Sequence, residues 1–204
     1  MGVYKLSAAG GLTTPRTNYS SFLAGNPAVS FGSYESIATV TVGGGGAANV
    51  EFTSIPSTYT HLEIRSIIRS NRTGGDDDSF IVNFNSDTGS NYSYHYMFGN
   101  GVGPGVGATA SQTKIFIPAI PATGSRATSI FAANVMSILD YKNTNKYKTI
   151  KALGNFDANG AGSVSLTSGL WQNTNAITSI KLQVFEGTGF EQYTQFALYG
   201  IKGS

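Results

Sequence analysis

The sequence contains no cysteine, and only two of its 204 residues are histidine. The absence of cysteine excludes disulfide bonds, thiolate chemistry and zinc sites that use cysteine ligands. Because His61 and His95 are the only histidines, a histidine-rich metal centre is not expected either. The composition therefore predicts a protein without a metal or organic cofactor.

Charged residues are also scarce, at 12% of the chain, which is about half of the usual share. The formal net charge of +2 is too small to indicate a protein that binds nucleic acid by neutralising phosphates. The surface must therefore consist largely of serine, threonine, asparagine, glycine and tyrosine. Such a neutral, hydrogen-bonding surface suits packed assemblies and contact with glycans.

Long apolar segments are missing as well. No apolar run approaches the roughly 20 residues that a membrane-spanning helix needs. The N-terminal sequence MGVYKLSAAGG lacks an uninterrupted apolar core, so a secretory signal is not expected. We expect a soluble protein that is made in the cytosol and has no membrane partner.

Motifs of common enzymes are not found. The G-x-S-x-G motif of serine hydrolases is absent, and both histidines lie in predicted strands. The four glycines at 43–46 are followed by neither a GK[ST] motif nor a helical pattern, which excludes a phosphate-binding loop. The sequence therefore predicts a protein that is not an enzyme.

Alternation of apolar and polar residues is the strongest positive signal, and it is clearest in the segment Ile55–Ser70. Ile64 and Ile68 fall on one face of an extended chain, whereas Arg65 and Arg69 fall on the other. This period of two is typical of a strand with one buried and one wetter face. We expect this segment to form a central strand.

Similar patterns recur along the chain and predict about eleven short strands separated by turns. The fold class that they indicate is all-β, an antiparallel β-sandwich that is jelly-roll-like, with a single-sheet barrel as the alternative. Tyr34–Val42 and Asn49–Ser54 are expected to form a hairpin around the glycines at 43–46. The glycine-rich segment Asn100–Gln112 is expected to be a long exposed loop.

The first 33 residues differ from the rest because their apolar residues are spaced irregularly and no acidic residue occurs. Two interpretations stay open: a leader or edge strand folded over the domain, or an arm that becomes ordered on a partner. We predict an extended N-terminal anchoring arm in residues 1–33 and a β-sandwich domain in residues 34–204. The expected partner-anchoring residues are Val3, Tyr4, Leu6, Leu12, Arg16, Tyr19, Phe22 and Leu23.

Aromatic residues gather in the predicted strand Tyr92–Phe98, where Tyr92, Tyr94 and Tyr96 share one face. Trp171, the only tryptophan, lies in a predicted turn. The tyrosines could be half-buried sheet residues with their hydroxyls at the rim. Alternatively, these four residues could stack on sugar rings or fill a subunit interface.

Three consecutive aspartates, Asp76, Asp77 and Asp78, directly follow two glycines in the segment Asn71–Ser79. Oxygen ligands on a loop are what calcium prefers, so these residues are weak calcium candidates. Their spacing is not that of an EF-hand, and adjacent carboxylates cannot all point inward. Charge on a solvated loop is the other interpretation.

Several segments resemble a small β-domain of virion proteins from tailed bacteriophages of the marine and cyanobacterial type. The resemblance implies a non-enzymatic virion structural protein, either a capsid decoration (cement) protein or a peripheral tail or fibre component. It also implies assembly in the host cytoplasm with other virion proteins, and a homo-oligomer. The alternative is an adhesin that binds a host-surface glycan. The segments are 34–46 (YESIATVTVGGGG), 52–65 (FTSIPSTYTHLEIR), 84–95 (FNSDTGSNYSYH), 138–153 (ILDYKNTNKYKTIKAL), 168–182 (SGLWQNTNAITSIKL) and 196–203 (FALYGIKG).

Overall fold

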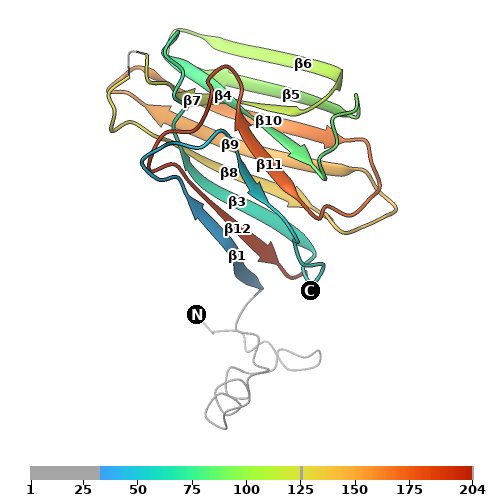
Figure 1. Ribbon diagram of the computed structural model, residues 1–204. Coiled ribbons are helices and arrows are strands. Elements are labelled where there is room, and N and C mark those ends of the chain that lie inside the picture. Colours follow the sequence, from blue (N-terminus) through green and yellow to red (C-terminus); the bar gives the residue numbers. More distant parts are fainter. Residues whose placement is uncertain (1–32, 125, 204) are drawn as a thin grey trace, which may run out of the picture. The chain divides into compact units, whose positions relative to one another are not determined.

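The computed structural model describes residues 33–124 and 126–203, and these form two antiparallel sheets packed face to face (Figure 1). This arrangement confirms the predicted all-β fold and the antiparallel β-sandwich. The predicted arm and its anchoring residues, from Val3 to Leu23, lie outside the described residues. In the part of the chain that is described, no helix is long and apolar enough to cross a membrane.

Twelve strands occur in the described residues. The large sheet has the order β1-β12-β3-β8-β9-β10-β5-β6, and the small sheet has the order β2-β11-β4-β7. In chain order the strands are β1 (Tyr34–Thr41), β2 (Val50–Phe52), β3 (His61–Ile68), β4 (Asp77–Phe84), β5 (Tyr92–Gly99), β6 (Pro104–Gln112), β7 (Ile115–Pro121), β8 (Ala132–Leu139), β9 (Lys148–Asp157), β10 (Gly162–Trp171), β11 (Ile180–Val184) and β12 (Gln195–Ile201).

Strand β3 lies inside the large sheet between β12 and β8, as its apolar pattern predicts. Leu62, Ile64 and Ile68 point into the core and are at most 1% exposed, whereas Arg65 faces solvent. Burial of each such side chain stabilises the fold by about 1.5–3 kcal/mol. This strand therefore supplies a central part of the hydrophobic core.

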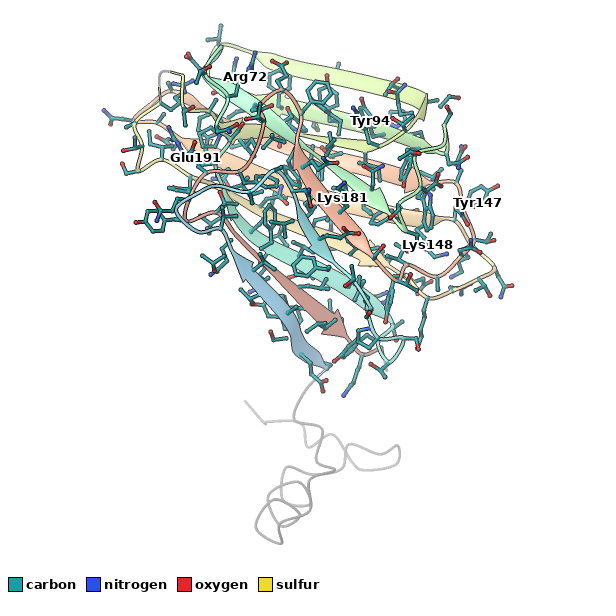
Figure 2. All side chains as sticks on the ribbon, in the orientation of Figure 1. Arg72, Tyr94, Tyr147, Lys148, Lys181 and Glu191 are labelled. Carbon is teal, nitrogen blue, oxygen red and sulfur yellow. The ribbon has the colours of Figure 1, made fainter. Side chains whose placement is uncertain are left out.

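The core lies between the sheets, where side chains from both fill the space (Figure 2). Along β9 every second side chain is buried and the others are exposed, which is the pattern of a strand covered on one face only. Phe80, Val82 and Phe84 of β4 close the core from the small sheet. The other face of the large sheet has no covering layer among the described residues.

The predicted hairpin around residues 43–46 is wrong. Strand β1 pairs with β12 in the large sheet, whereas β2 pairs with β11 in the small sheet. The glycines instead carry the chain from one sheet to the other. Gly46 has φ +69°, and a Cβ atom there would lie 3.0 Å from the carbonyl oxygen of Phe190, so a side chain is disfavoured.

The predicted loop Asn100–Gln112 contains an edge strand, β6, which pairs with β5. Its glycines accommodate aromatic rings from the neighbouring strand. A Cβ atom at Gly105 would lie 2.2 Å from the ring of Phe98, and one at Gly107 would lie 2.4 Å from the ring of Tyr96. The glycines that suggest a loop are therefore a packing requirement of a strand.

Candidate functional site

The outer face of the large sheet carries an uninterrupted row of exposed apolar side chains. The strand registers place Val135 opposite Leu153, Leu153 opposite Leu166, Leu166 opposite Met97, and Met97 opposite Val106. These five residues, here named the outer apolar row, are between 41% and 78% exposed. The row crosses five neighbouring strands, which at about 4.8 Å per strand spacing is roughly 19 Å.

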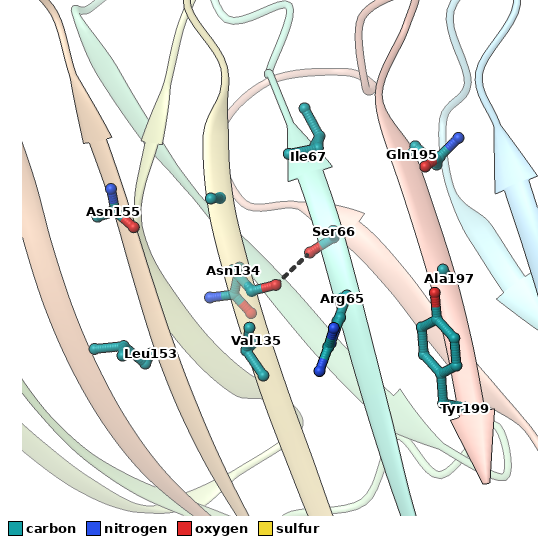
Figure 3. Close-up of a pocket in the computed structure, with 11 residues that line it drawn as sticks. Arg65, Ser66, Ile67, Asn134, Val135, Leu153, Asn155, Gln195, Ala197 and Tyr199 are labelled. Atoms are coloured by element: carbon teal, nitrogen blue, oxygen red, sulfur yellow. Dashed lines mark hydrogen bonds between the residues drawn. The ribbon is translucent and has the colours of Figure 1, made fainter. Parts of the chain in front are cut away.

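A shallow hollow of about 290 Å³ lies beside the row, over β12, β3, β8 and β9 (Figure 3). The small side chains of Ala133 and Ala197 leave this space open, while Arg65, Leu153 and Tyr199 line it. An apolar side chain from another protein could enter the hollow without displacing any of these groups.

Single exposed apolar residues are common on proteins and need no explanation, but a contiguous row of them marks a contact surface. Charged groups on this face are few. Arg65 forms an ion pair with Glu63 at 2.9 Å, so that its charge is partly balanced within the same strand. The outer face is therefore suited to another protein surface rather than to a small polar ligand.

A second feature, here named the aromatic groove, lies at the edge of the small sheet where β7 packs against β5. The groove has a volume of about 240 Å³, and its aromatic lining residues are Tyr96, Phe98, Phe116 and Phe185. Phe116 follows the fully buried Ile115 in β7, so the alternation of the strand points Phe116 away from the core.

The aromatic rings pack in a defined order. The ring centroids of Tyr94 and Tyr96 are 6.3 Å apart, as are those of Tyr96 and Phe98, and both pairs are within 30° of parallel. Phe116 lies 5.5 Å from Tyr96, and Phe185 meets Phe116 edge-on at 5.0 Å. These separations are in the range of favourable aromatic pairs, so the rings hold one another in place.

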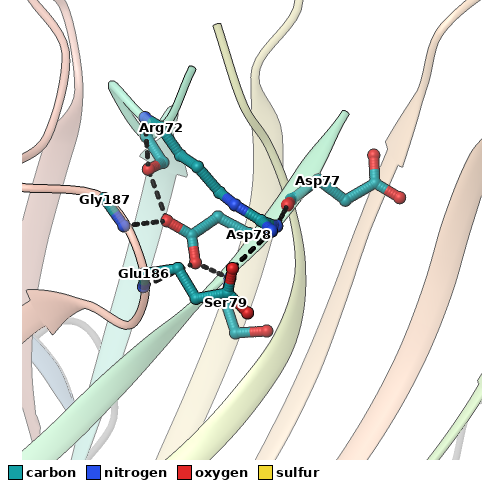
Figure 4. A network of polar contacts seen from close by, with 7 residues as sticks. Arg72, Asp77, Asp78, Ser79, Glu186 and Gly187 are labelled. Carbon is teal, nitrogen blue, oxygen red and sulfur yellow. Dashed lines mark hydrogen bonds and ion pairs between the residues drawn. The ribbon is translucent and has the colours of Figure 1, made fainter. Parts of the chain in front are cut away.

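The buried carboxylate of Asp78 organises the polar wall of the groove (Figure 4). It is 5% exposed and accepts hydrogen bonds from Ser70 Oγ at 2.5 Å and from the main-chain N–H groups of Ser79, Glu186 and Gly187 at 2.7–3.0 Å. Four donors satisfy both of its oxygens, as a buried carboxylate requires. Asp78 thereby fixes the start of the segment after β11 against β4.

Arg72 and Glu186 stand at the mouth of the groove. The Arg72 guanidinium forms an ion pair with the Glu186 carboxylate and donates to the main-chain carbonyl of Asp77 (Figure 4). The Asp77 carboxylate in turn lies 3.2 Å from Arg126. Charged groups of both signs are therefore held in fixed positions beside the aromatic rings.

The calcium interpretation of Asp76, Asp77 and Asp78 is wrong, because the three carboxylates do not converge. A bulge between β4 and β7 makes Ala119 an extra residue, with φ +73°, and Asp78 is turned into the interior. Asp76 and Asp77 instead lie within 4 Å of Arg126. Within residues 33–124 and 126–203, no group of three acidic or histidine residues is placed to hold a metal ion.

The glycan interpretation is wrong for Trp171 and Tyr92, which are only 1% and 0% exposed. The Trp171 indole donates to a carboxylate oxygen of Asp87 at 2.7 Å, and the Tyr92 hydroxyl donates to the main-chain carbonyl of Asp87 at 3.1 Å. Tyr94 and Tyr96 are partly buried, and Tyr96 lines the aromatic groove. Of the four predicted residues, only Tyr96 lines the aromatic groove, and Tyr94 packs beside it.

Phe98, Phe116 and Phe185 are not singled out by the sequence pattern. Phe116 lies in the run Ile-Phe-Ile, which is typical of a strand buried on both faces. Only the packing of two sheets brings these three rings to Tyr96. The alternation of glycine in β6 implies large neighbours in β5 and could have found Phe98, but it gives no signal for Phe116 or Phe185.

Replacing Asp87 with alanine is expected to lower the free energy of unfolding by about 2–3 kcal/mol, because the buried Trp171 N–H loses its acceptor. Burial acts to raise the pKa of Asp87, but hydrogen bonds from Trp171, Asn91 and Gly89 together hold it below its usual value. The folded state thus binds fewer protons than the unfolded chain. The stabilisation is present above the unfolded pKa of about 3.9 and is lost as the pH falls through the folded pKa.

Urea unfolding of wild type and the Asp87→Ala variant, followed from pH 7 down to pH 2, measures this effect. The difference between the two proteins should shrink below about pH 4. Asp157→Ala is the control, since Asp157 is exposed and accepts a hydrogen bond from the Gly160 N–H at 3.2 Å rather than from a buried side chain. A pH-independent difference for Asp87→Ala would contradict the assignment.

Comparison with known proteins supplies no counterpart for either surface. No protein-family model, no curated protein and no solved structure matches this chain. The outer apolar row and the aromatic groove are therefore the features of the described residues that indicate a function.

Proposed function

We propose that this chain is a non-enzymatic structural protein of a tailed-bacteriophage virion, either a capsid decoration protein or a peripheral tail or fibre component. In this proposal it assembles in the host cytoplasm with other virion proteins, and residues 1–33 anchor it to the particle. The outer apolar row is the observation that carries the proposal, because an apolar sheet face needs a protein surface to cover it. The charge-poor composition and the resemblance to virion β-domains support the same class of protein.

The outer face is suited to a second copy of this chain. The registers continue the row through Arg65 to Ala197, where the hollow lies. In a two-fold arrangement centred between β8 and β9, Met97 of each copy comes opposite Ala197 of the other, and Val135 comes opposite Leu153. A long side chain thus meets a hollow twice, which is the self-complementarity that a two-fold interface requires. Two sheets can pack in this way at about 10 Å.

Replacing Leu153 and Leu166 together with serine is expected to break this association. Each substitution removes apolar area from both copies, so the dissociation constant should rise by at least about 100-fold. Sedimentation velocity on the full chain, over a concentration series, measures the change. The same double variant should be taken up into particles at reduced occupancy, which quantitative mass spectrometry of purified particles reports.

Leu139→Ser is the matched control for this experiment. Leu139 is 51% exposed and lies on the same sheet face in β8, but it is not a member of the outer apolar row. It should therefore leave both association and particle occupancy unchanged. A wild-type chain that sediments as a monomer at tens of micromolar, or a double variant that behaves as wild type, would contradict the two-fold contact.

Immunogold electron microscopy of purified particles tests the virion assignment itself. Gold on the heads or tails of the phage that encodes the chain is the expected result. Finding the chain in the infected-cell lysate but not in purified particles would contradict the proposal.

A further inference from the structure

We propose that the aromatic groove binds an uncharged oligosaccharide. This inference goes beyond the structural role proposed above and rests on a different surface, since no member of the outer apolar row lines the groove.

The rings offer preformed stacking faces. Sugars present patches of C–H groups that carry a slight positive charge, and these pack on the negative face of an aromatic ring. Tyr96 and Phe98 lie over Gly107 and Gly105 of β6, so their orientation is set by the strand beneath them. Because the rings are already ordered, little side-chain entropy is lost when a ligand stacks on them.

The polar wall supplies acceptors and donors close to these rings. The side chains of Asp77 and Glu186 are 45% and 47% exposed, so both carboxylates can accept hydrogen bonds from sugar hydroxyls. Ser79 and Ser163 also line the groove. An apolar cavity with a few converging polar groups has the general character of a small-ligand site.

The charge of the groove selects against acidic sugars. Its lining contains the carboxylates of Asp77, Asp78 and Glu186 but only one guanidinium, that of Arg72. Arg126 pairs with both Asp76 and Asp77, and Lys114 Nζ lies 5.1 Å from the centroid of the Phe185 ring, so the groove and its rim hold four carboxylates and three cationic groups. Uronic acids and sulfated sugars would therefore meet an excess of like charge, which disfavours their binding. The ligand class that remains is uncharged.

The site is longer than one sugar unit. A polar hollow of about 530 Å³ shares Arg72 and Glu186 with the aromatic groove and is otherwise lined by residues such as Asn71, Thr73 and Thr188. The hydroxyl groups of Thr73 and Thr188 can both donate to and accept from sugar hydroxyls, whereas the Asn71 side-chain oxygen already accepts from the main-chain N–H groups of Thr188 and Gly189. One sugar unit stacked on the rings and the next in this hollow would account for both spaces, so an oligosaccharide fits better than a single sugar.

A glycan microarray probed with the labelled full chain tests the proposal. The probes are uncharged gluco-, manno-, galacto- and N-acetylglucosamine oligosaccharides, with oligogalacturonates as the acidic set. The expected result is binding to at least one uncharged series and none to the oligogalacturonates, with the affinity then measured by titration calorimetry. Failure to bind any uncharged series, or equal binding of the acidic set, would overturn the proposal.

Variants locate the site. Phe98→Leu and Phe185→Leu each remove a ring face but keep apolar bulk, so each is expected to weaken binding by at least about tenfold. Glu186→Gln keeps the shape of the polar wall and should also weaken binding, which covers the case in which Phe98→Leu fails to fold. Tyr147→Leu is the control, because Tyr147 is 54% exposed and does not line the groove.

The outcomes of this experiment are independent of the virion proposal. If Phe185→Leu and Glu186→Gln both bind as wild type does, the groove is not the site. Loss of sugar binding in these variants, with particle occupancy unchanged, would support the groove and leave the assembly role to the outer apolar row.

Discussion

Replacing Arg69 with alanine is expected to lower the free energy of unfolding by about 3–5 kcal/mol. Arg69 is 2% exposed, and its guanidinium donates to the main-chain carbonyl groups of Ala122, Arg126, Ala127 and Ile130 at 2.7–3.2 Å. The alanine variant leaves these four acceptors without their donor and opens a cavity. The connection between β7 and β8 should therefore lose its attachment to the core.

Arg65→Ala is the matched control for this prediction, because Arg65 lies four residues earlier in the same segment and on the same side of the alternation. Its side chain is 59% exposed and pairs with Glu63, so its removal should cost no more than about 1 kcal/mol. Arg69→Lys should give an intermediate loss, since one ammonium group cannot reach all four carbonyls. Urea unfolding measures all three variants. Equal losses for Arg65→Ala and Arg69→Ala would show that the four hydrogen bonds contribute little.

Replacing Lys148 with methionine has the second large expected effect, a loss of about 2–4 kcal/mol. Lys148 is fully buried, and its ammonium group donates to the main-chain carbonyls of Asn143, Lys146 and Thr174 at 2.6–3.0 Å. It thereby joins the β8–β9 connection to the segment that follows β10. Methionine keeps the apolar part of the side chain, so the loss of stability mainly measures the three hydrogen bonds to main-chain carbonyls that the variant lacks.

Lys151→Met provides the comparison on the same strand, because Lys151 is exposed on β9. It should change the free energy of unfolding by no more than about 0.5 kcal/mol. Thermal unfolding by calorimetry measures both variants. A Lys148→Met protein as stable as wild type would mean that the cost of burying the ammonium group cancels the benefit of its hydrogen bonds.

Alternation in the sequence predicts which segments are extended and which residues of β3 face the core, because a strand places successive side chains on opposite faces. It does not predict strand partners. The pattern predicts a hairpin formed by Tyr34–Val42 and Asn49–Ser54, yet β1 and β2 lie in different sheets. Arg69 reads as a solvent-facing residue by the same alternation, but the segment before β8 covers it.

The candidate site was less accessible to sequence reasoning for a related physical reason. Trp171 reads as an exposed turn residue, and only the fold reveals that Asp87 lies in reach of its indole N–H. Phe116 and Phe185 come from different parts of the chain and meet at the edge of the small sheet. The groove depends on contacts between sheets, and no local pattern encodes those.

Tyr96 and Phe98 pack on Gly107 and Gly105 of the edge strand β6, so the order of the two rings depends on the stability of that edge. Strand β6 is the last of its sheet, so its outward N–H and C=O groups are open to pairing with another chain. If β6 frayed from β5, Tyr96 and Phe98 would lose the surface beneath them at the same moment. A ligand that stacks on the two rings would stabilise them against β6, and it would therefore also reduce edge-to-edge association of the protein.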